Sequence, residues 1–73
     1  MNNRLTPFKL ARQLDGLTQE QLQKMTGLNP STISLIETNR LRPTMKERMK
    51  LSRALPSFGR AVEMLKMMEP KNE

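Results

Sequence analysis

The chain has 73 residues, enough for one small domain with a modest hydrophobic core. It contains no cysteine and no histidine, which excludes a disulfide framework, a Cys/His zinc site and the usual histidine general base. Thirteen Lys and Arg residues against seven Asp and Glu residues give a formal charge of +6. That charge favours a polyanionic partner, either nucleic acid or an anionic membrane, although it can also serve solubility alone.

No targeting or membrane segment is visible in the sequence. The first residues lead into no apolar run long enough for a signal peptide, and no stretch approaches the roughly 20 apolar residues of a membrane span. The lack of cysteine is also typical of a reducing compartment. We therefore expect a cytoplasmic protein that does not enter a membrane.

Helix start and stop signals recur at short intervals along the chain. Most of the predicted starts combine a capping side chain with a Pro at the first helical position or with a capping-box partner three residues later. Strand-like alternation is absent. The sequence predicts an all-α fold, a compact bundle of five short helices. The expected helices span 7–15, 19–26, 30–38, 44–55 and 58–68, with caps at Thr6, Thr18, Asn29, Thr44 and Ser57.

Glycine, asparagine and proline mark where these helices should end. Gly16 and Gly27 can adopt a positive φ, Asn39 is the next-best residue for a left-handed cap, and Pro56 cannot continue a helix. We expect residues 1–69 to form a single domain and 70–73 to form a disordered tail.

The segment 18–39 contains two predicted helices of about eight residues that only Gly27-Leu28 separates. Because this turn is too short for antiparallel packing, the two helices should cross steeply, as in a helix-turn-helix. We expect the crossing to be filled by the apolar residues Leu22, Met25, Leu28, Ile33 and Ile36.

The second of these helices has two different faces. At helical spacing, Ile33 and Ile36 share one face, and Ser31, Leu35 and Thr38 point the opposite way. Short hydroxyls and one aliphatic side chain can enter a DNA major groove, where hydroxyls bond base edges and an aliphatic group touches a thymine methyl. The same residues could also be ordinary solvated positions.

The chain resembles the Cro and phage-repressor helix-turn-helix family, also called lambda-repressor-like or XRE-type, over about residues 8–55. Each shared element is weak alone, but together, at fixed spacing, they are a strong signal. The resemblance implies a lambda-repressor-like DNA-binding domain encoded by a bacterium or a phage. The shared elements are Gly-Leu-Thr-Gln at 16–19, Thr-Gly-Leu at 26–28, Ser-Thr-Ile-Ser-Leu-Ile-Glu at 31–37, Pro43, and Met45, Met49, Leu51, Ala54 and Leu55.

The resemblance also implies which residues meet DNA. Pro30 stands where relatives often carry a base-reading Gln or Arg, so direct readout should rest on its neighbours. The expected base-reading residues are Asn29, Ser31, Thr32, Ser34 and Leu35. The expected phosphate contacts are Gln19, Asn39, Arg40, Arg42 and Lys46, although the loop among them could instead carry charge for solubility.

In the same family an Arg of the first helix pairs with a Glu at the end of the recognition helix. By this resemblance Arg12 should pair with Glu37 and fasten the first helix to the third. Otherwise both side chains would be exposed and unpaired.

Small relatives bind as twofold dimers, so we expect a homodimer whose two recognition helices lie roughly 34 Å apart on a palindromic operator. The methionines of the last helix suit an adaptable interaction surface, but they can also fill gaps in a core. The dimer candidates are Phe58, Met64, Leu65, Met67 and Met68.

The leading functional hypothesis is a transcriptional regulator, expected to be a repressor, that binds a double-stranded DNA operator. The alternative is a protein-interaction module, antitoxin-like or regulator-binding, that uses the Met-rich helix 58–68. An enzyme is disfavoured because the sequence shows neither a nucleophile–base set nor a Gly-rich phosphate loop. We expect no cofactor, no metal and no small-molecule effector.

Overall fold

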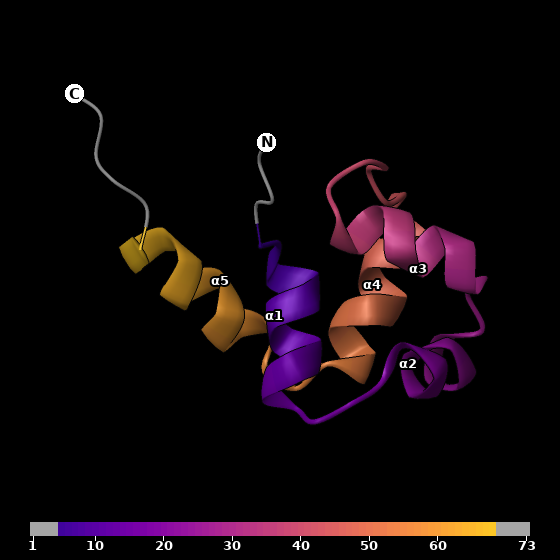
Figure 1. Cartoon of the computed structure of the whole chain (residues 1–73), viewed down its shortest axis with the longest axis horizontal. Helices are drawn as coiled ribbons and strands as arrows, with labels where there is room; N and C mark the ends of the chain where they lie inside the picture. Colours follow the sequence, from indigo (N-terminus) through magenta and orange to yellow (C-terminus); the bar gives the residue numbers. More distant parts are fainter. Residues whose placement is uncertain (1–4, 69–73) are drawn as a thin grey trace.

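A computed structural model describes residues 5–68, and within that range it contains five α-helices and no strand (Figure 1). The all-α bundle expected from the sequence is therefore confirmed. Residues 1–4 and 69–73, which include the expected tail at 70–73, lie outside the described residues. The helices are α1 (Pro7–Leu14), α2 (Gln19–Thr26), α3 (Pro30–Glu37), α4 (Met45–Ala54) and α5 (Phe58–Met68).

Side-chain caps explain why the first four helices begin where they do. Thr18 and Thr44 each form a complete capping box, with Gln21 and Glu47 respectively, and this satisfies backbone N–H groups that lack a partner inside the helix. Asn29 accepts from the backbone of the first turn of α3. These starts lie within one residue of the predicted positions, because the caps are local to the sequence.

Three helices end with a residue in the left-handed region, and Gly27, with a φ of 75°, ends α2. Gly16 has a φ of 67° and follows α1, and Asn39 has a φ of 62° and follows α3. After Asn39 the chain closes the helix with backbone bonds from Asn39 to Ile36 (3.1 Å) and from Arg40 to Leu35 (2.8 Å). This pair of bonds is a Schellman motif. It turns the chain sharply at the end of α3, so that Arg40 and the residues after it do not continue along the helix axis.

The core lies where α3 and α4 pack on α2 and where α1 packs on α3 and α5. Its fully buried members come from all five helices or their ends, and Phe8, Leu10, Leu17, Leu28 and Phe58 pack around them. The buried apolar residues are Ala11, Leu22, Ile33, Ile36, Leu51, Ala54, Leu55 and Ala61.

The prediction that Met25 fills the helix crossing is wrong. Met25 is 55% exposed, and Thr26 takes the inward position instead. Thr26 lies four residues after Leu22, so the two share one face of α2, and that face packs against α3 and α4. Burial of Thr26 is tolerated because its hydroxyl donates to the Leu22 carbonyl oxygen at 2.8 Å.

The last helix, α5, packs against α1 and extends away from α2 and α3 (Figure 1). Ala61 is fully buried in this contact, and the Phe8 and Phe58 ring centroids lie 5.0 Å apart. Ser57 does not cap α5 with its hydroxyl, as the sequence had suggested. Its hydroxyl and backbone N–H both donate to the Asp15 carboxylate, at 2.5 and 3.1 Å. A hydrogen bond to a charged carboxylate is stronger than the neutral hydrogen bond that the hydroxyl would accept from a helix N–H.

Replacing Asp15 by Ala should lower the free energy of unfolding by about 1.5 kcal/mol, the lower end for hydrogen bonds to a charged group, because the site is only partly buried. The loss is measured by urea denaturation followed by circular dichroism. Asp15→Asn is the matched control, since its amide oxygen can still accept from Ser57. Equal losses for the two variants would show that these bonds do not hold α5 on α1.

Candidate nucleic-acid interface

The outward face of α3 is open to solvent along its length. Its inner residues Ile33 and Ile36 are 1% and 2% exposed, so the helix is fixed in rotation by its apolar side. Leu35 on the outer face is 40% exposed. Of the remaining predicted base-reading residues, Asn29, Ser31 and Ser34 are exposed and Thr32 is half-buried.

The hydrogen bonds of this face show which polar groups can meet a ligand. The Asn29 Oδ1 accepts from the Ser31 backbone N–H at 2.9 Å, so this oxygen caps the helix. The Thr38 hydroxyl donates back to the Ser34 carbonyl oxygen at 2.9 Å. Within residues 5–68 the hydroxyls of Ser31 and Ser34 have no hydrogen-bond partner in the protein. These two hydroxyls and the Leu35 side chain therefore form the part of α3 that is free for recognition.

The Glu37 carboxylate at the end of α3 is 2% exposed and accepts three hydrogen bonds. The Arg12 guanidinium donates through Nε to Oε2 at 2.6 Å and through Nη2 to Oε1 at 3.1 Å. The Gln19 amide nitrogen donates to Oε1 at 2.9 Å. A charge so deeply buried needs partners of this kind, and the pair therefore fastens α3 to both α1 and the start of α2.

The backbone of Glu37 is held as well. The Thr6 hydroxyl, which also caps α1, donates to the Glu37 carbonyl oxygen at 2.9 Å. Arg12, which is 14% exposed, uses its Nη1 to donate to the Leu17 carbonyl oxygen at 2.9 Å. Sequence reasoning missed both contacts. Thr6 and Glu37 are 31 residues apart, and a threonine that caps a helix carries no local signal for a second partner.

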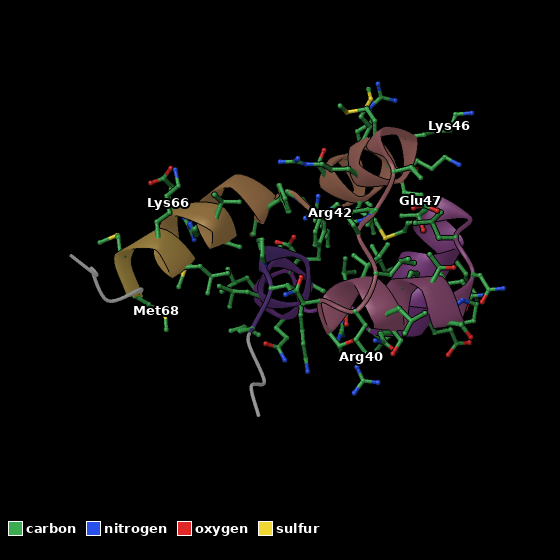
Figure 2. The ribbon with its side chains drawn as sticks, turned by 90° about the horizontal axis from the view of Figure 1, so that it is seen from above. Arg40, Arg42, Lys46, Glu47, Lys66 and Met68 are labelled. Carbon is green, nitrogen blue, oxygen red and sulfur yellow. The ribbon has the colours of Figure 1, made fainter. Side chains whose placement is uncertain are left out.

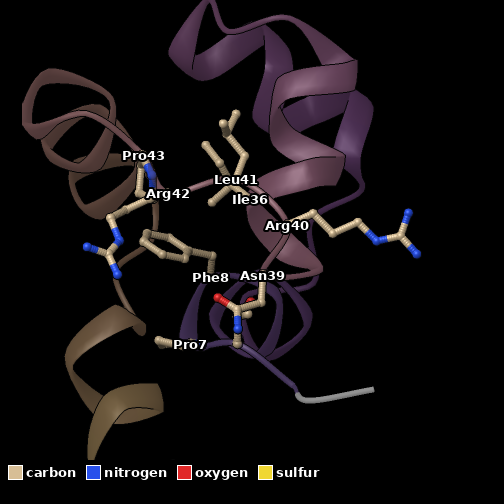
Figure 3. Close-up of a pocket in the computed structure, with 9 residues that line it drawn as sticks. Pro7, Phe8, Ile36, Asn39, Arg40, Leu41, Arg42 and Pro43 are labelled. Atoms are coloured by element: carbon tan, nitrogen blue, oxygen red, sulfur yellow. The ribbon is translucent and has the colours of Figure 1, made fainter. Parts of the chain in front are cut away.

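The predicted phosphate-binding residues do not form one patch. Asn39, Arg40, Arg42 and Lys46 are exposed, and Gln19 is half-buried against Glu37. Arg40 projects on the α3 side of the molecule, and Arg42 lies between α4 and the α1–α5 pair (Figure 2). Figure 3 shows the same divergence at close range: Arg40 points away from the hollow between α1 and the 38–43 loop, and Arg42 lies near the Phe8 ring.

Comparison with models of known protein families identifies the family to which this chain belongs. The model of a family described as helix-turn-helix matches residues 8–57, which is 50 of the 73 residues. The chain belongs to the Cro/C1-type helix-turn-helix family. Neither the curated proteins nor the solved structures contain a significant match.

As a member of the helix-turn-helix family, the chain carries a DNA-binding regulatory domain, and the family is not one of enzymes. Within the matched range, α2 and α3 follow one another with only residues 27–29 between them. The family match ends at Ser57, one residue before α5 begins. Among residues 5–68, no helix is long and apolar enough to cross a bilayer.

Proposed function

We propose that this helix-turn-helix protein binds a specific duplex with α3 in the major groove, as a homodimer on an operator with twofold symmetry, and thereby represses transcription. Its place of action would be the cytoplasm of a bacterium, whether the gene is bacterial or phage-borne. The outer face of α3 is the observation that carries this proposal. Its two partner-free hydroxyls and one exposed leucine are small enough to approach base edges closely.

In this proposal the polar and apolar groups of α3 have different tasks. Ser31 and Ser34 would bond base edges, and Leu35 would contact a thymine methyl. Asn29 and Thr32 would contribute from the start of the helix, where side chains come nearest to bases in this type of docking. Each correct base contact of this kind is worth about 1–3 kcal/mol of discrimination.

Selection of bound duplexes from a random pool tests the proposal directly. We expect one enriched motif with twofold symmetry, and binding that weakens steeply as salt rises. Binding to all duplexes with equal affinity at physiological salt would contradict sequence-specific regulation. A motif without symmetry would contradict the homodimer while leaving the DNA-binding function in place.

Phosphate contacts would come from Gln19, Asn39, Arg40, Arg42 and Lys46. We expect Arg40→Ala to weaken every duplex to a similar extent and to reduce the salt slope by about one unit, because one phosphate contact is lost. Affinities at several salt concentrations measure this. Arg53→Ala removes the same charge from the exposed side of α4 and should leave the slope unchanged. A changed preference among duplexes in Arg40→Ala would instead assign Arg40 to base reading.

The second candidate function is a protein-interaction module, and the exposure of the methionines on α5 favours it. Met67 is 82% exposed and Met68 is 67% exposed, and methionine adapts well to varied partners. In a pure interaction module, the protein would show no preference for one duplex over random competitor DNA. The selection described above therefore separates the two functions.

A further inference from the structure

A groove of about 540 Å³ lies between α1, α4 and α5. Its apolar walls include the rings of Phe8 and Phe58, whose centroids lie 5.0 Å apart with 37° between the ring planes. Both residues are half-buried, so part of each side chain is open to solvent. Met45 and Val62 extend the apolar lining on α4 and α5. The groove therefore offers both aromatic and aliphatic surface to a ligand.

Two arginines line the same groove, Arg42 from the loop before α4 and Arg48 from α4 itself. Of the eight described residues that line it, none is acidic. Neither arginine forms an ion pair with another described residue. The Glu47 carboxylate, next to Arg48 in the sequence, accepts from the Thr44 backbone N–H at 3.0 Å instead. Because a guanidinium binds a planar carboxylate through parallel hydrogen bonds, the two arginines suit an anion of that kind.

The size of the groove favours a small molecule over a macromolecule. A stable protein–protein interface takes about 20–30 residues from each partner, whereas eight described residues line this groove. Its volume lies within the range of about 300–1,000 Å³ that is typical of small-molecule sites. A DNA backbone could approach the two arginines, but its phosphates carry no apolar group to cover Phe8 and Val62. The occupant that suits both the charges and the apolar walls is a small organic acid with an apolar tail.

We propose that the groove binds a small carboxylic acid, with its apolar tail on Phe8 and Phe58 and its carboxylate between Arg42 and Arg48. The tail gains free energy because apolar surface on both sides leaves water, and the carboxylate gains charge-assisted hydrogen bonds. The helix-turn-helix family match ends one residue before α5, and α5 forms one wall of the groove. The match therefore does not supply this site.

Arg42 connects the groove to DNA binding. It is one of the expected phosphate contacts, and with Pro43 it also lines the neighbouring hollow beside Asn39 and Arg40 (Figure 3). A carboxylate bound to Arg42 competes with a DNA phosphate for the same guanidinium. Because coupling between two binding events is reciprocal, the acid weakens duplex binding and the duplex weakens acid binding. This coupling, unlike the binding of the acid itself, rests on the proposed function.

Titration of the full chain with phenylbutyrate, followed by methyl NMR without DNA, tests the binding. We expect saturable shifts of the Val62 and Met45 signals with a dissociation constant of about 1 mM or lower. The Met25 signal, which belongs to a different surface, should not shift. Phenylbutyramide has the same tail without the charge, so it should bind about tenfold more weakly or worse. No saturation below about 10 mM, equal binding of acid and amide, or equal shifts of Met25 would overturn the proposal.

A charge reversal identifies the arginine side of the site. Arg48→Glu should weaken phenylbutyrate about tenfold or more and should favour phenylbutylamine, a cation with the same tail. Arg53→Glu is the matched control: it lies on the same helix, is exposed, changes the net charge equally and does not line this groove. It should change the dissociation constant by no more than about twofold. Equal effects of the two variants would overturn the proposed site.

The affinity for the selected operator at several salt concentrations tests the coupling. Saturating phenylbutyrate should reduce the salt slope by about one unit, as the loss of one phosphate contact does. Acetate at equal concentration, an anion without the tail, is the control and should leave the slope unchanged. An unchanged slope in the saturated protein would overturn the coupling. A chain that prefers no duplex would count against the proposed function alone, because the site is judged in the titration without DNA.

Discussion

Glu37→Ala should lower the free energy of unfolding by about 3–5 kcal/mol, which makes it the most damaging single substitution that we predict. The Glu37 carboxylate is 2% exposed and holds Arg12 through two hydrogen bonds and Gln19 through one. Its removal leaves the Arg12 guanidinium, 14% exposed, without its counterion. Leaving one charge unpaired at such a site costs far more free energy than the intact pair contributes to stability.

Urea denaturation followed by circular dichroism measures this loss. Because a domain of this size has only about 5–15 kcal/mol of stability, Glu37→Ala can be largely unfolded in water. Glu37→Gln keeps the side-chain volume and one acceptor oxygen, so it should lose less and give a complete transition. Glu63→Ala, an exposed glutamate on α5, is the control and should stay within about 0.5 kcal/mol of the parent. A loss below about 1 kcal/mol for Glu37→Ala would place the pair among ordinary surface ion pairs.

Leu35→Glu should reduce the affinity for the selected operator by about 100-fold or more while leaving the fold intact. The side chain is 40% exposed on the outer face of α3, so a carboxylate there is tolerated in the free protein. In the proposed complex it would face base edges and phosphates, and such like-charge contacts cost several kcal/mol. The measurement is a competition titration of wild type and variant on the same duplex.

Leu14→Glu is the matched control for this experiment. Leu14 is 42% exposed, nearly the same as Leu35, but it lies on α1, away from the outer face of α3. It makes the same change of net charge, so it should lower the affinity by no more than about threefold at physiological salt. Similar losses for the two variants would mean that α3 does not read the operator through this face.

Local chemistry accounts for most of what the sequence predicted correctly. A threonine three residues before Gln21 or Glu47 defines its helix start without help from the rest of the chain. The same holds for Gly16 and Asn39, whose left-handed conformations end α1 and α3. The succession of α2 and α3 followed from the short connection at residues 27–29. Each of these features depends on residues that lie within a few positions of one another, so it can be recognised from a single sequence.

The features that the sequence did not predict depend on contacts between distant segments. Whether Met25 or Thr26 faces inward depends on where α4 lies, and α2 alone offers no signal for it. Ser57 bonds Asp15, 42 residues away, and no motif links the two. The phosphate-binding role of Gln19 stays a prediction, since its amide nitrogen bonds Glu37 here. The hollow that Phe8, Met45 and Phe58 line together exists only because α1, α4 and α5 meet there.

The anchoring of Glu37 also bears on how the proposed regulator would choose an operator. Its carboxylate and its carbonyl oxygen accept hydrogen bonds from Thr6, Arg12 and Gln19, so in the proposed complex α3 would already be rigid when it meets a duplex. Little chain entropy is then lost on association. A helix that cannot adjust leaves all bending and twisting to the double helix. In the proposed complex, base steps that α3 never touches would therefore influence affinity through their stiffness, and pliable pyrimidine–purine steps would be distinguished from stiff, narrow A-tracts by mechanics alone.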